Sequence, residues 1–278
     1  MSYYGTLLVI IVSLAVITVA LFWVVSWYKR KQKEQFLGQK LSLDDQKVLE
    51  KLPYYRLLSK TDQKAIASSI NLFIHTKIFE GVGIEVTREM RIVTAFYACL
   101  LLLRREDLGC YENLTTIIFY PSAVRIDKKE EHSGVVVQEQ VWIDGEAADD
   151  TLVLIWHDAK KEAYHLRKEN VIIHEFAHEI DFMDGRADGM PPLLGSQYGA
   201  WSKLLYNVFH RLQTKVEHNR EWGAYKLFGS YAASNEAEFF AVATERFFQK
   251  PQSFAKHFPK LYKQLRDFYK IDPLTLLQ

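Results

Sequence analysis

The chain has 278 residues, which is enough for one large domain with a substantial apolar core. Its 35 basic and 34 acidic side chains leave a net charge of +1, so charge gives no reason to expect direct nucleic-acid binding. The two cysteines, Cys99 and Cys110, lack the spacing of a structural zinc site, and they do not indicate a disulfide framework.

The first predicted element is a membrane-spanning helix. No charged residue precedes Lys29, and residues 7–25 are almost entirely apolar, which is long enough to cross a bilayer. A cleaved signal peptide would carry its positive charge before the apolar core, and long uncharged runs are rare in buried core helices. By the positive-inside rule, the N-terminus would lie outside and the remaining chain in the cytoplasm. We therefore expect a single-pass membrane protein with an anchor at 1–28 and a basic, polar tether at 29–41.

Residues 42–278 are predicted to form one α+β domain, mostly helical with a small mixed sheet. Helix-start signals occur at Ser42 and Ser59, and residues 87–103 are apolar on most faces, as in a buried helix. Beyond about residue 160 the pattern is helical again, so helices, a sheet and further helices follow one another. Short β-branched and aromatic runs bounded by turn residues indicate strands at 115–120, 134–137, 141–143 and 152–156.

Segment 170–183 has the apolar spacing of a helix and carries the main chemical signal. His174 and His178 are four residues apart, so both imidazoles project from nearly the same helix face and can reach one metal ion. Glu175 can approach a water molecule at that ion without being a ligand. This is the HExxH pattern of zinc hydrolases, with the glutamate as general base. Two surface histidines paired with carboxylates are the alternative, but the continuous apolar helix disfavours it.

A third zinc ligand is expected downstream, because catalytic zinc usually has three protein ligands and one open position. Segment 234–248 is a predicted helix in which Glu238 and Glu245 are seven residues apart and share a face. Spacing alone does not choose between them, and a solvated helix charge is the alternative for each. Asp181 and Glu245 could instead orient a ligand, although a helix-surface position suits either equally well.

Two segments carry a resemblance to a known family. HEFAHEIDFMDG (174–185) and YAASNEAEFFAVATERFF (231–248) resemble the Mlc titration factor A family of zinc peptidases and, more distantly, the catalytic domain of anthrax lethal factor. The likeness covers roughly residues 45–278 and implies a zincin-like metallopeptidase fold. In such folds the strand before the active-site helix, here 152–156, is an edge that pairs with an extended peptide substrate. The predicted membrane anchor departs from the family pattern.

The resemblance also implies roles for individual residues. It makes Glu238 the third ligand of Zn²⁺, beside His174 and His178. It places the phenol of Tyr231 near the substrate oxyanion, where a hydrogen-bond donor stabilises developing charge. Glu175 remains the general base that takes a proton from water and passes it to the leaving amine. No organic cofactor is implied.

The predicted function is therefore zinc-dependent hydrolysis of a peptide or protein substrate. The family name refers to sequestration of a transcriptional repressor, so the alternative is a membrane-tethered protein that binds a repressor-type regulatory protein, with proteolysis secondary or absent. A deformylase-like amidase would need a cysteine ligand, and neither cysteine has a suitable context. An intramembrane protease is disfavoured because HEFAH lies far from the apolar segment. Four histidines have no ligand spacing and are interpreted as structural or solvated: His157, His165, His210 and His218.

Overall fold

The computed structural model describes residues 3–37, 39–122, 150–218 and 222–276. The strands predicted at 134–137 and 141–143 lie outside these residues. Short 3-10 helices are labelled η. The elements in chain order are α1 (Tyr3–Leu37), α2 (Leu43–Lys51), α3 (Pro53–Leu57), α4 (Lys60–Thr76), β1 (Ile78–Gly81), α5 (Arg88–Leu101), η1 (Glu106–Leu108), β2 (Thr116–Tyr120), β3 (Thr151–Ile155), α6 (Trp156–Ala163), α7 (Val171–Asp181), η2 (Phe182–Asp184), α8 (Gly195–Glu217), η3 (Gly223–Leu227), η4 (Tyr231–Ala233), α9 (Glu236–Gln249), α10 (Pro251–His257), α11 (Pro259–Tyr269) and α12 (Pro273–Leu276).

The three described strands form a parallel sheet in the order β1–β2–β3. Because side chains alternate along a strand, the register places Phe79, Ile117 and Leu152 in one buried row, with Phe119 and Leu154 in the next. Helix α5 provides the crossover that parallel neighbours such as β1 and β2 require. The predicted α+β class, mostly helical with a small sheet, is confirmed. The sheet was predicted to be mixed, but every pairing among the described strands is parallel.

Several helices begin where local capping signals predict. Ser42 caps α2 by accepting the backbone N–H of Asp45, and the Asp45 carboxylate accepts the N–H of Ser42 in return. Ser59 and Thr87 cap α4 and α5 by accepting N–H groups three residues further on. At these three helices, side chains within the same segment are therefore sufficient to mark the helix start.

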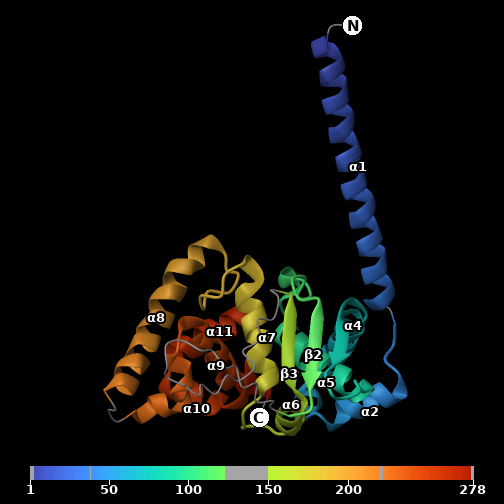
Figure 1. The fold of residues 1–278 in the computed structure, drawn as a ribbon. Helices are drawn as coiled ribbons and strands as arrows, with labels where there is room; N and C mark the ends of the chain where they lie inside the picture. Colours follow the sequence, from blue (N-terminus) through green and yellow to red (C-terminus); the bar gives the residue numbers. More distant parts are fainter. Residues whose placement is uncertain (1–2, 38, 123–149, 219–221, 277–278) are drawn as a thin grey trace, which may run out of the picture.

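Helix α7 lies between the sheet and the C-terminal helices (Figure 1), where it packs against β3 and α5 and also against α9. Its burial follows the helical period of its apolar residues. The ring of Phe176 makes edge contacts with Phe73 of α4 and with Tyr111, which follows η1. The fully buried hydrophobic residues of α7 are Ile172, Ile173, Phe176, Ala177 and Ile180. The two histidines of HEFAH occupy the face of α7 that looks toward α9.

Helix α1 extends away from the rest of the molecule (Figure 1) and continues through 29–37, most of the predicted tether. Near its C-terminal end Phe36 stacks on His75 of α4, with ring centroids 4.2 Å apart. A membrane span needs about 20 consecutive apolar residues in one helix. Among the described residues no helix is both long enough and apolar enough to cross a membrane. The prediction of a single-pass membrane protein, with a transmembrane helix in 1–28, an outward N-terminus and a cytoplasmic domain, is therefore wrong.

Candidate metal centre

Three side chains fix the start of α7, and with it the direction of His174 one turn later. Asn170 is the N-cap, and its Oδ1 accepts the backbone N–H three residues further on at 3.1 Å. The N–H of Asn170 itself donates to Glu245 at 3.0 Å, and the N–H of Val171 donates to Glu162 at 2.7 Å. Backbone donors that a helix N-terminus leaves open are thus satisfied by carboxylates from two other helices.

Helix α9 supplies the carboxylates that face α7. Its N-cap is Asn235, whose Oδ1 accepts the N–H of Glu238 at 2.8 Å. Glu238 lies in the first turn of α9, where a negative charge is favoured by the helix dipole. From residue 239 to the end of the helix every residue is buried, which fixes α9 against α7. The side chain of Glu238 therefore extends from a rigid element toward the two histidines.

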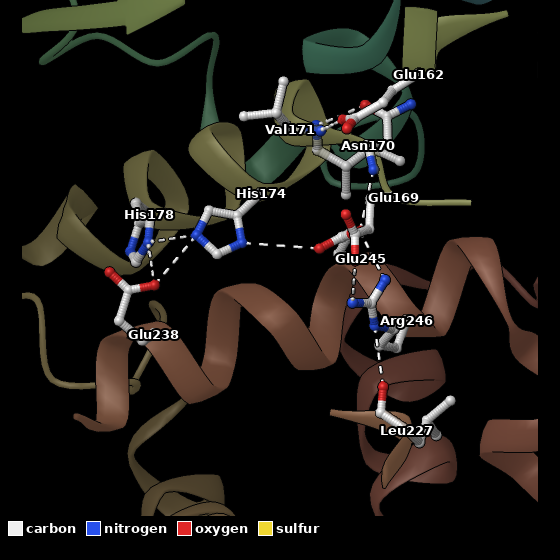
Figure 2. A network of polar contacts seen from close by, with 11 residues as sticks. Glu162, Glu169, Asn170, Val171, His174, His178, Leu227, Glu238, Glu245 and Arg246 are labelled. Atoms are coloured by element: carbon white, nitrogen blue, oxygen red, sulfur yellow. Dashed lines mark hydrogen bonds and ion pairs between the residues drawn. The ribbon is translucent and has the colours of Figure 1, made fainter. Parts of the chain in front are cut away.

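The ligand triangle consists of three atoms: Nε2 of His174, Nε2 of His178 and Oε2 of Glu238 (Figure 2). The two nitrogens are 3.2 Å apart, and the carboxylate oxygen lies 3.2 Å from Nε2 of His174 and 3.4 Å from Nε2 of His178. Tetrahedral zinc with bonds of about 2.0–2.1 Å separates its ligand atoms by about 3.3–3.4 Å. The spacing and the donor set, two imidazoles and a carboxylate, fit a zinc ion.

The charges around the ligand triangle also favour a cation. Oε2 of Glu238 is buried and accepts no hydrogen bond of good geometry from any described residue. Burial by itself would lower the pKa of His174, but the neighbouring carboxylates of Glu238 and Glu245 raise it to about 10. Burial would raise the pKa of Glu238, but the two imidazoles hold it well below its usual range. In the absence of metal, His174 therefore retains a proton that a metal ion must displace.

Glu245 faces the other nitrogen of the same imidazole. Its Oε2 lies 3.9 Å from Nδ1 of His174, whereas Glu238 approaches Nε2 (Figure 2). The two glutamates that spacing alone could not distinguish thus lie on opposite sides of one ring. Of the two, Glu238 belongs to the ligand triangle and Glu245 does not.

Glu175 and Tyr231 lie beside the ligand triangle. Glu175 is half-buried on α7, next to His174. Tyr231 opens η4, which packs against α9, and its ring centroid is 6.1 Å from that of His174. The side chain of Tyr231 is 57% exposed, so its phenol can reach a molecule that enters from solvent. Both residues thus lie close to His174, one of the three residues of the ligand triangle.

The sequence profile of the glucose-regulated metallo-peptidase M90 family matches residues 25–270 of this chain. The chain belongs to the M90 family. An uncharacterized protein of Synechocystis sp. is 34% identical over 236 residues, covering 81% of this chain and 82% of the relative. Mlc titration factor A of Serratia proteamaculans is 34% identical over 236 residues, covering 80% and 86%. Mlc titration factor A of Escherichia coli is 29% identical over 232 residues, covering 81% and 85%. The predicted family resemblance is confirmed, and membership of a metallopeptidase family implies a metal.

In this M90 chain Asp181 forms a hydrogen bond with the loop that follows α7. Its side chain is fully buried, and Oδ2 accepts the N–H of Gly189 at 2.8 Å. The carbonyl of Gly189 accepts the indole N–H of Trp201 at 3.1 Å. Burial raises the pKa of Asp181 to about 7. This hydrogen bond goes to the loop backbone rather than to a histidine.

Sequence reasoning missed two residues of this region. Asn170 carried a readable signal, because an asparagine directly before an apolar helical run is a common N-cap. Arg246 carried none, since its contacts come from segments distant in sequence. The histidines interpreted as structural lie outside any metal-ligand cluster of the described residues. Three of them, His165, His210 and His218, contact groups within four residues on their own helix or its end.

Proposed function

We propose that this chain is a zinc-dependent peptidase with a zincin-like fold, in which His174, His178 and Glu238 hold the ion. The observation that carries the proposal is the ligand triangle, whose separations of 3.2–3.4 Å suit tetrahedral zinc. Membership of a metallopeptidase family supports it independently. We assign the catalytic domain to residues 42–278, which contain the sheet, α7 and α9.

When bound, a zinc ion supplies a Lewis acid that polarises a carbonyl and makes water more acidic. Glu175 accepts the proton of the attacking water and delivers it to the departing amine, and its position next to His174 suits this role. Tyr231 donates a hydrogen bond to the carbonyl oxygen of the substrate, which becomes negative as water attacks. A fixed donor at this oxygen stabilises the developing charge. The negative charge of Glu238 partly neutralises a bound dication, so no second carboxylate ligand is required.

An extended peptide substrate would pair with β3. This strand is at one end of the described sheet order and contacts α7, so a chain lying along it would pass near HEFAH. Main-chain hydrogen bonds to an edge strand give affinity with little dependence on side chains. The strand ends at Ile155, one residue earlier than predicted, because Trp156 begins α6.

The test compares the full-length protein with Glu175→Gln. Zinc content is measured after dialysis, and cleavage of a peptide library is followed by mass spectrometry. We expect both proteins to retain close to one zinc per chain, and we expect cleavage by the variant to fall at least about 100-fold, which is the lower end for removal of a general base. A wild-type protein without bound zinc would refute the metal site. Equal cleavage by both proteins would refute the role of Glu175.

A second candidate function is binding of a regulatory protein of repressor type. It is favoured by the relatives from Serratia proteamaculans and Escherichia coli that carry the name Mlc titration factor A. Binding and cleavage are separable in one experiment, because Glu175→Gln should leave a binding surface unchanged. Co-purification of Mlc with both wild type and variant, without any peptide cleavage by wild type, would favour binding over proteolysis.

A further inference from the structure

His174 has two ring nitrogens, and they face different carboxylates. Nε2 faces the ligand triangle, so Nδ1 is the nitrogen left to interact with the protein. In metal sites the partner of the second nitrogen fixes the tautomer and the orientation of the ring. Here that position is occupied by Oε2 of Glu245, at an ion-pair distance of 3.9 Å.

The carboxylate of Glu245 is held so that one oxygen points at the histidine ring. Its Oε1 accepts two hydrogen bonds, from the backbone N–H of Asn170 at 3.0 Å and from Nη1 of Arg246 at 2.9 Å. Because both donors are on Oε1, Oε2 is left to face His174. The side chain is 6% exposed, so little solvent screens its charge from the ring.

Arg246 in turn is fixed by three different segments (Figure 2). Besides Glu245, its guanidinium donates from Nε to the carbonyl of Leu227 at 3.0 Å and from Nη2 to Glu169 at 3.2 Å. Leu227 ends η3, four residues before Tyr231. The guanidinium therefore ties α9 to the chain before α7 and to the segment that leads to the exposed tyrosine.

We propose that Glu245 is a positioning residue of the metal centre, which holds the ring of His174 with Nε2 directed at the metal position. Arg246 keeps the carboxylate in the orientation that does this. The proposal rests on the proposed zinc site and adds a residue that does not contact the ion. It predicts that removing the charge of Glu245 weakens metal binding while all three ligands remain.

The experiment measures Zn²⁺ affinity of the full-length protein by competition with a chromophoric chelator at one pH. Glu245→Gln should bind Zn²⁺ about 10–100-fold more weakly than wild type, as is typical when the outer partner of a ligating histidine is removed. Glu245→Asp, which keeps the charge, should recover part of the loss. With Co²⁺ in place of Zn²⁺, the visible spectrum of Glu245→Gln should remain typical of tetrahedral coordination, because the three ligands are the same. Its absorption bands should shift, because the His174 ring is no longer held in the same orientation.

Glu162→Gln is the matched control. Glu162 also accepts a backbone N–H at the start of α7, from Val171, but makes no contact with His174. If both glutamines weaken Zn²⁺ binding equally, the effect comes from the helix start and the proposal fails. It also fails if Glu245→Gln binds as tightly as wild type, or if Glu245→Asp binds no better than Glu245→Gln. A wild-type protein without Zn²⁺ affinity would instead refute the metal site itself.

Discussion

Two glutamates on α9 face the same histidine in different surroundings. Glu238, near the N-terminus of the helix, marks what we call its ligand end, and Glu245 lies seven residues further on. At the N-terminal end, Oε2 of Glu238 is buried 3.2 Å from His174 and accepts no good hydrogen bond from the described protein. At the other end, Glu245 is more deeply buried, and its Oε1 receives two donors. The first carboxylate has an oxygen without a hydrogen bond from the described residues, whereas the second is held in place by two donors on one oxygen.

This difference shows how burial should be interpreted in such a site. A buried acid is costly unless its charge is paired, so each buried carboxylate must have a partner. Glu245 has its partners within the protein, whereas the charge of Glu238 is balanced by imidazoles that share the same face. This contrast agrees with the proposed roles, in which Glu238 binds the metal ion and Glu245 supports His174.

The largest expected effect is on the ligand end. Glu238→Gln removes the anionic ligand and should weaken Zn²⁺ binding by more than about 100-fold, beyond the range expected for an outer partner. Glu236→Gln is the control, because Glu236 lies in the same first turn of α9 but outside the ligand triangle. Chelator competition measures both variants. Comparable Zn²⁺ affinities for Glu238→Gln and Glu236→Gln would contradict the assignment of Glu238 as a metal ligand.

A second prediction disturbs the ligand end without changing a ligand. Gly189 has φ +74°, and a Cβ there would lie 2.7 Å from the carbonyl oxygen of Glu236 and 3.0 Å from Leu205. We expect Gly189→Ala to lower the free energy of unfolding by about 1–3 kcal/mol and to weaken Zn²⁺ binding, because the first turn of α9 must shift. Urea denaturation and chelator competition check the two effects.

Gly185→Ala separates backbone strain from crowding in this experiment. Gly185 has φ +87°, but a Cβ there would have no neighbour within 4 Å. It should therefore show the cost of the left-handed backbone alone and leave Zn²⁺ affinity unchanged. If Gly185→Ala weakens Zn²⁺ binding as much as Gly189→Ala, the contact with α9 is not what positions Glu238.

Local pattern was sufficient to predict helix α7 and that its two histidines share one face, because residues four apart on a helix project in nearly the same direction. It was insufficient for Glu238 and Glu245. Both satisfy the same periodicity, and what separates them is how α9 crosses α7, a tertiary property. Resemblance to a family supplied the choice that spacing left open.

Other features lay beyond single-segment reasoning for similar reasons. Arg246 joins Glu169, Glu245 and Leu227, which no local pattern brings together. The mostly helical α+β class could be predicted, since strand and helix periods differ, but parallel pairing depends on crossovers. The predicted membrane span rested on the apolar run and on the basic residues that follow it, and the described helices do not meet the requirement for one.

The smallest expected effect concerns Asp181, a buried acid whose hydrogen bond goes to the loop at Gly189. Burial raises the pKa of Asp181 from 3.8 to about 7, so between these values the folded chain holds a proton that the unfolded chain has released. The stability contributed by this group is complete below pH 4, declines as the pH rises toward 7, and is lost above it. Asparagine cannot ionise and can still accept the N–H of Gly189.

The stability of Asp181→Asn relative to wild type should therefore increase as the pH rises. We expect the difference in unfolding free energy between the two metal-free proteins to move in favour of the variant by about 1–4 kcal/mol from pH 4 to pH 8. Urea denaturation at both pH values measures it, and groups common to both proteins cancel. Zn²⁺ affinity should stay within about 3-fold of wild type, because Asp181 bonds to the loop at Gly189. A tenfold loss would mean that a buried acid can affect Zn²⁺ binding without facing His174, which would weaken the special role given to Glu245.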